Sequence, residues 1–320
     1  MANLQVESET LAEGRFIMKP ITPEKSKLGF VGIGYMGRPI ARRLLESGLQ
    51  LSAYDRDRGK AEELIQYGGS VAKSVSDLAS SSSVILSCLP SDEAVLDIYK
   101  GPDGACANMS PGSVIIDMST VYPETSRELS RLGSERGIEV LDVTISGSVP
   151  AAEQGSLTLF GGGDQECFNA AESIFRVLAR KYFYLGPSGS GATMKLVVNT
   201  LLGTGMQAIA EAVALGEKAG LDRHRLLDVL SETAVVAPAH LGKLQRAMHG
   251  DYSPQFPLRL MNKDFGLIFY LAAAVGARMP ATEAAFEVNA RQSEQGQEQD
   301  FSAVILQMEK QAHLAMEKLR

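Results

Sequence analysis

The chain has no tryptophan, only three cysteines and only four histidines among its 320 residues. Three widely separated cysteines, Cys88, Cys106 and Cys167, do not suit a disulfide framework and are typical of reduced thiols in a cytosol-like compartment. Neither the cysteines nor the histidines show metal-ligand spacing, which argues against a metal site and against a histidine-based triad. We therefore expect a cytoplasmic protein without a bound metal.

The sequence also lacks an excess of basic charge. Its 31 Lys and Arg against 38 Asp and Glu give a net charge of −7, which argues against a surface for nucleic acid or anionic membranes. No apolar stretch is judged from the sequence to be both long enough and free enough of charge to cross a bilayer, so we expect no membrane partner. Residues 1–26 are polar and unpatterned, and they predict a flexible extension.

A strand, a glycine-rich turn and a helix are predicted from residue 27 onward. Gly32, Gly34 and Gly37 have the G-x-G-x-x-G spacing, which allows a sharp turn, a close approach to a pyrophosphate and tight helix packing. Asp55 ends the next strand, about 20 residues further on, where such motifs place a ribose contact. The turn therefore predicts a dinucleotide site. The cofactor contacts expected in this region are Gly32, Ile33, Gly34, Tyr35, Met36, Gly37, Asp55 and Arg56.

The same alternation of strands and helices continues through VILSCLP, SVIIDMST and IEVLDVTIS. It predicts a Rossmann-type doubly wound parallel sheet, whose ligands lie at the carboxyl ends of the strands. Those ends carry Pro90, Ser119, Thr120 and Ser146. After Gly186 the strand signals stop and the pattern becomes helical. We expect a dinucleotide-binding domain at 27–189 and an all-α domain for substrate and oligomerisation at 190–320.

The stretch 186–215 reads as one long, largely buried helix that links the two domains. Lys195 lies among apolar residues of this helix, where a lone ammonium is costly unless it has partners or a task. A lysine that extends from a core helix to water remains an alternative. Asn199 lies on the same face and can hold the substrate or the lysine. Gly191, one turn earlier, is expected to leave room for a ligand.

Several motifs together resemble the β-hydroxyacid dehydrogenase family, which includes 3-hydroxyisobutyrate dehydrogenase. They occur in order over 27–312 and read GFVGIGYMG, IIDMSTVYPETS, DVTISGSVPAAEQGSL, GSGATMKLVVNT, FPLRLMNKD and DFSAVI. The SGS segment, the Asn-Thr pair after the lysine and the last two motifs are most similar to the glyoxylate/succinic semialdehyde reductase branch.

The resemblance implies an NAD(P)H-dependent reductase of small carboxylate-bearing aldehydes such as succinic semialdehyde and glyoxylate. It implies that Lys195 protonates the carbonyl oxygen, with Asn199 in support. The implied substrate contacts are Ser146, Gly147, Ser148, Lys195, Asn199, Phe256 and Asp264, and the further cofactor contacts are Leu89, Pro90, Thr120 and Lys263. A plain turn residue at Ser146, a core residue at Phe256 and a surface ion pair at Lys263 and Asp264 remain the alternatives.

The residues after the second strand leave the cofactor open. Relatives that use NADPH usually carry Asn-Arg-Thr there, whereas this chain has Asp55, Arg56, Asp57 and Arg58. A carboxylate at Asp55 favours the free ribose hydroxyls of NAD and repels a 2′-phosphate, but Arg56 or Arg58 can offset that repulsion. The branch favours NADPH, and Asp55 favours NAD.

Other activities fit the same architecture. Imine reductases usually carry Asp or Tyr where Lys195 stands, which argues against that activity. Another β-hydroxyacid dehydrogenase activity, such as that of 3-hydroxyisobutyrate dehydrogenase, is a further alternative. A non-catalytic dimerisation module of this fold is disfavoured by Lys195, Ser146 and Asn199 together. The apolar segments LLGTGMQAIAEAVAL and LIFYLAAAVG exceed what one small domain buries, so we expect a homodimer or homotetramer through the all-α domain.

Overall fold

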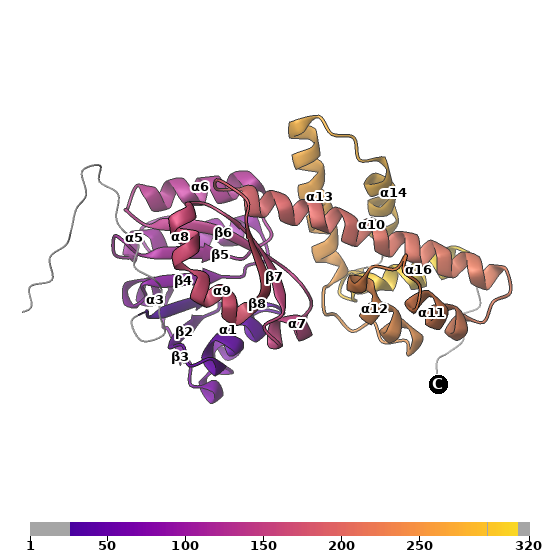
Figure 1. The fold of residues 1–320 in the computed structure, drawn as a ribbon, viewed down its shortest axis with the longest axis horizontal. Coiled ribbons are helices and arrows are strands. Elements are labelled where there is room, and N and C mark those ends of the chain that lie inside the picture. The colour runs from indigo at the N-terminus through magenta and orange to yellow at the C-terminus, as the bar shows by residue number, and fades with distance from the viewer. Residues whose placement is uncertain (1–25, 293, 313–320) are drawn as a thin grey trace, which may run out of the picture.

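The computed structural model describes residues 26–292 and 294–312, and all but the last residue of the predicted extension lies outside this range. Two lobes are joined by one long helix, α10 (Ser190–Lys218), which runs from the sheet of the first lobe into the helices of the second (Figure 1). An N-terminal Rossmann domain is thus followed by a helical C-terminal domain.

The first lobe is built on one eight-stranded sheet with the order β3-β2-β1-β4-β5-β6-β7-β8. β1 lies between β2 and β4, so the chain order reverses at this point and leaves a crevice where dinucleotides bind in such sheets. The strands are β1 (Leu28–Val31), β2 (Leu51–Tyr54), β3 (Ser70–Val71), β4 (Val84–Ser87), β5 (Val114–Asp117), β6 (Glu139–Ser146), β7 (Leu157–Gly162) and β8 (Ala179–Tyr184).

The predicted parallel sheet is confirmed from β3 to β6, and the strand direction reverses after β6. β7 pairs antiparallel with β6, and β8 pairs parallel with β7. Only residues 147–156 connect β6 to β7, and a parallel return needs a crossover of about a dozen residues or more. The chain therefore turns back beside β6, which keeps the end of that strand at the crevice.

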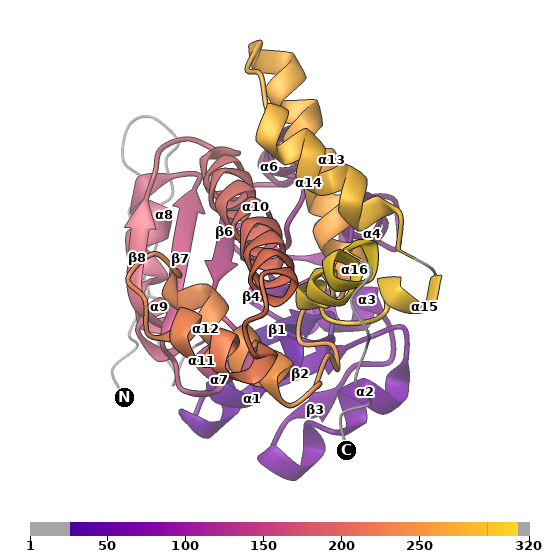
Figure 2. The same ribbon diagram turned by 90° about the vertical axis from the view of Figure 1, so that its right-hand side faces the viewer.

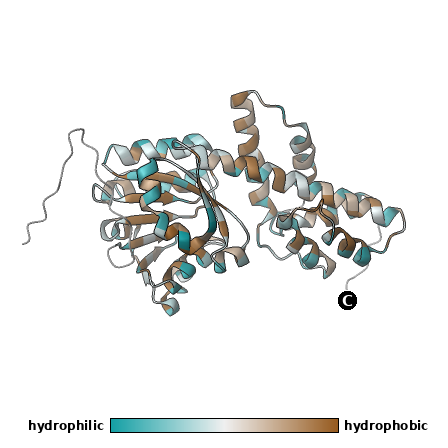
Figure 3. Ribbon diagram, in the orientation of Figure 1, coloured by the Kyte–Doolittle hydropathy of each residue, from teal (hydrophilic) through white to brown (hydrophobic). Residues whose placement is uncertain are grey.

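Helices cover both faces of the sheet, and the buried strands are the most hydrophobic part of this lobe (Figure 3). Between β7 and β8 the chain forms two short helices that are separated at Ala171, and Ala179 then opens β8. The helical elements are α1 (Gly37–Glu46), α2 (Arg58–Glu62), η1 (Ile65–Tyr67), α3 (Val75–Ser81), α4 (Asp92–Tyr99), α5 (Ala105–Asn108), α6 (Pro123–Ser134), α7 (Val149–Glu153), α8 (Gln165–Ala170) and α9 (Glu172–Leu178).

The second lobe packs shorter helices around α10 and has a hydrophobic core of its own (Figure 2). Pro238 and Pro280 begin two of these helices, where the missing N–H of proline costs no hydrogen bond. The elements are α11 (Arg223–Ser231), α12 (Pro238–Met248), α13 (Leu258–Val275), α14 (Pro280–Ala290), α15 (Glu294–Gln297), η2 (Phe301–Ala303) and α16 (Val304–Gln311).

By length and composition alone, α10 passes the test for a membrane span, with a mean hydropathy of 1.3 over its most apolar window. The expectation that no stretch qualifies is therefore wrong by this criterion. In the structure, 44% of that window is buried, and the helix packs on β6 and β7 at one end and on α13 and α16 at the other. These contacts are those of a core helix that serves both lobes.

Candidate active site

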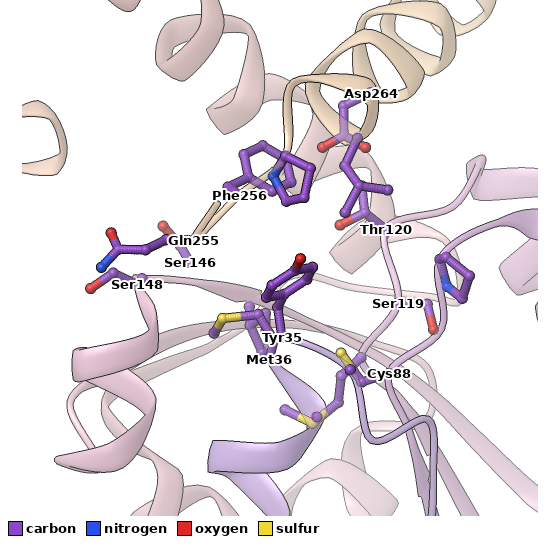
Figure 4. A pocket seen from close by; sticks show the side chains of 18 of the residues that line it. Tyr35, Met36, Cys88, Ser119, Thr120, Ser146, Ser148, Gln255, Phe256 and Asp264 are labelled. Atoms are coloured by element: carbon purple, nitrogen blue, oxygen red, sulfur yellow. The ribbon is translucent and has the colours of Figure 1, made fainter. Parts of the chain in front are cut away.

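A cleft of about 1180 Å³ lies between the two lobes, at the carboxyl ends of β1, β4, β5 and β6. Its other walls are α10, α12 and the segment from Gln255 to Asp264. The volume exceeds the usual range for a single small ligand and accommodates a dinucleotide together with a small substrate. Of the predicted site residues, every one except Ile33 lines this cleft, and Figure 4 shows several of their side chains.

The glycine turn between β1 and α1 has the geometry that a pyrophosphate requires. Gly32 has φ of +91°, and a Cβ there would lie 2.4 Å from the carbonyl oxygen of Cys88. A Cβ on Gly37 would lie 1.8 Å from the carbonyl oxygen of Gly32, so the helix could not pack as it does. A Cβ on Gly34 would meet nothing within 4 Å, which leaves open space facing the cleft. The turn therefore fits a nicotinamide dinucleotide.

The Asp55 carboxylate is hydrogen-bonded to the backbone of this turn and is not left without partners. Its Oδ2 accepts a hydrogen bond from the N–H of Ile33 at 2.7 Å, and its Oδ1 accepts one from the N–H of Asp57 at 2.9 Å. Ile33 does not line the cleft, since its side chain is buried and its N–H is bonded to Asp55, and its contact with the cofactor stays a prediction. Arg56 lines the cleft, whereas Arg58 is paired with Glu62 at 2.8 Å. Of these two arginines, only Arg56 lines the cleft.

The loops after β4 and β5 are tied together by one buried carboxylate. Asp117 Oδ1 accepts hydrogen bonds from the hydroxyls of Ser87 and Ser119 at 2.7 and 2.6 Å. Ser119 Oγ in turn accepts one from the N–H of Leu89 at 2.9 Å. Burial raises the pKa of Asp117. The network fixes Leu89, and with it the cleft wall that also carries Thr120.

Lys195 projects from α10 into the cleft and is half-buried. Burial lowers the pKa of its ammonium, while the nearby carboxylate of Asp264 raises it and the ammonium of Lys263 lowers it further. No hydrogen bond from Lys195 Nζ to the described residues occurs, so its donors remain available to a ligand. The structure therefore places Lys195 in a ligand cleft rather than on a solvated surface.

A buried chain of polar groups lies beside Lys195. Asn199 and Asp264 are each 1% exposed, and the Asn199 amide donates to Asp264 Oδ2 at 2.6 Å. Asn199 Oδ1 meets no donor among the described residues, so it can accept from Lys195, one turn away, or from a substrate. Lys263 lies 3.0 Å from Asp264 Oδ1 and donates to the carbonyl of Thr120 at 2.5 Å, which links the two lobes across the cleft.

Gly191 does not provide room for a ligand, contrary to expectation. A Cβ there would lie 2.2 Å from the carbonyl oxygen of Asp142 and 2.5 Å from that of Phe160. The missing side chain lets α10 approach β6 and β7 instead. Both oxygens of Asp142 accept N–H groups from Gly189 and Ala192, each at 2.9 Å, and so fix the start of α10 one turn before Lys195.

The segment predicted to hold a carboxylate follows β6. Gly147 has φ of +145°, and a Cβ there would lie 2.7 Å from Leu157 Cδ2. Ser148 precedes α7, but its hydroxyl does not cap the helix. Ser146 and Ser148 both line the cleft, and neither hydroxyl donates to a residue in the described part of the chain. These hydroxyls are free to bind an anion.

Three residues of the helical wall were not predicted from the sequence. Lys243 and Gln255 line the cleft, and the buried Asp300 accepts a hydrogen bond from Lys243 Nζ at 2.6 Å. Asp300 belongs to the DFSAVI motif, but its partner is 57 residues away and no local pattern joins them. Cys88 also lines the cleft, and burial raises the pKa of its thiol to about 12, so it is not a thiolate nucleophile.

Two family profiles match successive parts of the chain. Residues 27–186 match the profile described as the NAD-binding domain of 6-phosphogluconate dehydrogenase. Residues 189–308 match the profile described as NAD-binding of NADP-dependent 3-hydroxyisobutyrate dehydrogenase. The two profiles meet between β8 and α10.

Individual relatives cover nearly the whole chain. The chain is 34% identical to glyoxylate/succinic semialdehyde reductase 1 of Arabidopsis thaliana, over 87% of this chain and 97% of the relative. Among solved structures it is similar to a 3-hydroxyisobutyrate dehydrogenase of Mycobacterium tuberculosis with L-serine, at a TM-score of 0.76 and 29% identity over 88% and 98% of the two chains. It is also similar to Psf3 in complex with NADP+ and 2-OPP, at a TM-score of 0.80 and 26% identity over 87% and 99%.

Proposed function

Since the chain belongs to the β-hydroxyacid dehydrogenase family, as an NAD(P)-dependent oxidoreductase that acts on CH–OH groups, we propose that it reduces small carboxylate-bearing aldehydes to hydroxy acids. Succinic semialdehyde and glyoxylate are the first candidates, because the Arabidopsis relative is named for them. The observation that carries the proposal is the unpaired, half-buried ammonium of Lys195 in the same cleft as the glycine turn.

Lys195 acts as the proton donor. When bound, a reduced nicotinamide nucleotide supplies the hydride. As negative charge develops on the carbonyl oxygen, the Lys195 ammonium stabilises it and gives up a proton, and the partly dry cleft strengthens this interaction. In the direction of oxidation, the neutral amine accepts the proton of the hydroxyl group. Asn199 Oδ1 orients the ammonium, and the Asp264 carboxylate keeps it charged.

The carboxylate of the substrate binds after β6. The free hydroxyls of Ser146 and Ser148 donate to it, and the bare backbone of Gly147 leaves space for close approach. Phe256 is half-buried and makes a T-shaped contact with the ring of Phe301. It forms the apolar wall that limits substrate size. This arrangement favours short substrates whose carboxylate is bonded to the carbonyl carbon or lies within a few carbons of it.

A panel of aldehydes tested with NADH and NADPH examines the proposal. We expect succinic semialdehyde and glyoxylate to be reduced with kcat/KM values well above those of neutral aldehydes of the same length. Cyclic imines are the informative comparison, because imine reductases share this fold. If imines were reduced faster than every carboxylate-bearing aldehyde, or if the purified protein oxidised neither cofactor with any aldehyde, the proposal would be wrong.

We propose further that the protein is a cytoplasmic homodimer or homotetramer assembled through the helical lobe. Large apolar side chains on α10 and α13 support this, because Leu201, Leu215, Tyr270 and Val275 are all at least two thirds exposed. The three cysteines are free, which suits a reducing compartment. Light scattering that detected only monomers at micromolar concentration would contradict the assembly.

A further inference from the structure

Asp300 is the polar centre of the helical wall. It is fully buried, and its Oδ2 accepts hydrogen bonds from Lys243 Nζ at 2.6 Å and from the backbone N–H groups of Gln255 and Phe256 at 3.1 Å each. Its Oδ1 accepts from the Ser302 hydroxyl at 2.8 Å. One carboxylate thus fixes both the lysine and the backbone that carries Gln255.

Lys243 then sets the orientation of the Gln255 side chain. Its Nζ donates to Gln255 Oε1 at 3.2 Å. Because an ammonium has donors only, the amide oxygen must face it and the amide nitrogen must face away. Gln255 lines the cleft, and no residue within 26–292 or 294–312 accepts a hydrogen bond from its Nε2. Two N–H donors are therefore held in place and left free for a ligand.

The free amide faces the segment assigned to the carboxylate. In Figure 4 the end of the Gln255 side chain points toward Ser148, and both residues line the same cleft as Ser146. Gln255 precedes α13 in the helical lobe, whereas both serines belong to the Rossmann lobe. The Gln255 amide and the two serine hydroxyls can all donate hydrogen bonds, and the Lys243 ammonium is bonded to the Gln255 amide oxygen. Such a set of donors binds an anion better than a neutral group.

We propose that Gln255 is a specificity-determining residue, whose Nε2 donates a hydrogen bond to the substrate carboxylate from the side opposite Ser146 and Ser148. This inference rests on the proposed function and adds a contact from the helical lobe. It makes carboxylate recognition depend on both lobes, with Asp300 and Lys243 as positioning residues that do not themselves touch the substrate.

Gln255→Glu is the most direct test, because it keeps the shape and the acceptor for Lys243 while it replaces two donors by a negative charge. Kinetics with succinic semialdehyde are compared with those of butanal, which has the same length and no carboxylate. We expect KM for succinic semialdehyde to rise about tenfold or more, with kcat for that substrate and kcat/KM for butanal within about twofold of wild type. Gln255→Ala changes KM in the same direction by a smaller factor.

Gln165→Ala is the matched control, because Gln165 is an exposed glutamine at the start of α8 and does not line the cleft. It is expected to leave both substrates unchanged. An unaltered preference for the carboxylate substrate in Gln255→Glu would overturn this inference, as would an equal loss for both substrates, which indicates a structural role. If wild type reduces succinic semialdehyde no faster than butanal, the proposed function itself fails, and that result is distinguishable from failure of the Gln255 contact alone.

Discussion

The two walls of the cleft are built by different means. The Rossmann wall consists largely of backbone turns at glycines, which have no side chain. Asp55, the acidic residue beside the glycine turn, is hydrogen-bonded to backbone N–H groups. The helical wall presents charged and amide side chains held by one another, such as Asn199 with Asp264 and Lys243 with Asp300. The first wall suits a large invariant cofactor, and the second allows substrate and chemistry to change through single substitutions.

The largest expected effect comes from removing the Lys195 ammonium from the helical wall. Lys195→Ala should lower kcat by about 10³-fold or more, because the developing negative charge loses its proton donor. Nucleotide affinity, measured by quenching of protein tyrosine fluorescence or by calorimetry, should stay near that of wild type. Lys181→Ala, at an exposed lysine of β8, is the control. Near-normal turnover of Lys195→Ala would show that the helical wall is not catalytic.

A side chain at Gly34 should weaken nucleotide binding by the Rossmann wall while the protein still folds. Its Cβ meets no atom within 4 Å, so Gly34→Val is expected to fold while its side chain occupies space needed by the nucleotide. We expect nucleotide affinity to fall roughly a hundredfold, about 2.7 kcal/mol. Gly37→Ala is the contrast, because its Cβ collides with the carbonyl of Gly32 and should lower the melting temperature. Unchanged nucleotide binding in Gly34→Val would place the pyrophosphate elsewhere.

The rates of reduction and of oxidation should depend on pH in opposite ways. Burial lowers the pKa of Lys195 below its usual 10.5, and reduction needs the ammonium form. Above this lowered pKa, kcat/KM for reduction should fall about tenfold per pH unit, whereas oxidation of the hydroxy acid should rise toward the same pKa. Profiles measured in both directions with saturating cofactor check this. Parallel profiles in the two directions would rule out Lys195 as the titrating group.

Asp55→Asn tests how the Rossmann wall selects its cofactor. We expect the ratio of kcat/KM for NADPH to that for NADH to rise about tenfold, because the change removes a negative charge near the 2′ position. It should also cost about 1 kcal/mol of stability, since one of the N–H groups of Ile33 and Asp57 loses its acceptor. Arg56→Ala should shift the ratio the opposite way. A constant ratio in both variants would move the discrimination to other residues.

The smallest effect concerns a charge far from the cleft. Burial, and then the neighbouring Glu309, raise the pKa of Glu217 near the end of α10 to about 7. The folded state binds the proton more tightly than the unfolded state, so this stability is present below about pH 4.5 and is lost as the pH rises to about 7. Glu217→Gln should stabilise the protein by about 1 kcal/mol at pH 8 and not at pH 4.5. The free energy of unfolding in urea, measured at both pH values, checks this prediction. Glu232→Gln, at an exposed glutamate, is the control.

The Rossmann wall was predictable from local sequence, and the helical wall only in part. Gly32, Gly34 and Asp55 lie in one strand-turn-helix-strand segment whose spacing alone implies their positions. Asn199 and Asp264 are 65 residues apart, and Lys243 and Asp300 are 57 apart, so their pairing depends on helix packing that no short pattern encodes.

Gly191 illustrates the same limit. Periodicity places it on a face of α10 near that of Lys195, but it cannot say that this part of the helix meets β6 and β7. The resemblance to known motifs supplied the roles of Lys195, Ser146 and Phe256, and the structure adds that all three line one cleft. Gln255 is absent from the predicted set because an isolated glutamine in a loop carries no pattern until its partners are known.

The most direct test is a crystal structure with bound NADP+ and a hydroxy acid or a non-reactive analogue. We predict that Lys195 Nζ lies within about 2.6–3.2 Å of the oxygen that becomes the hydroxyl, on the side of the cleft facing the nicotinamide. A complex in which this nitrogen points into solvent, or in which the substrate oxygen contacts another proton donor instead, would contradict the account.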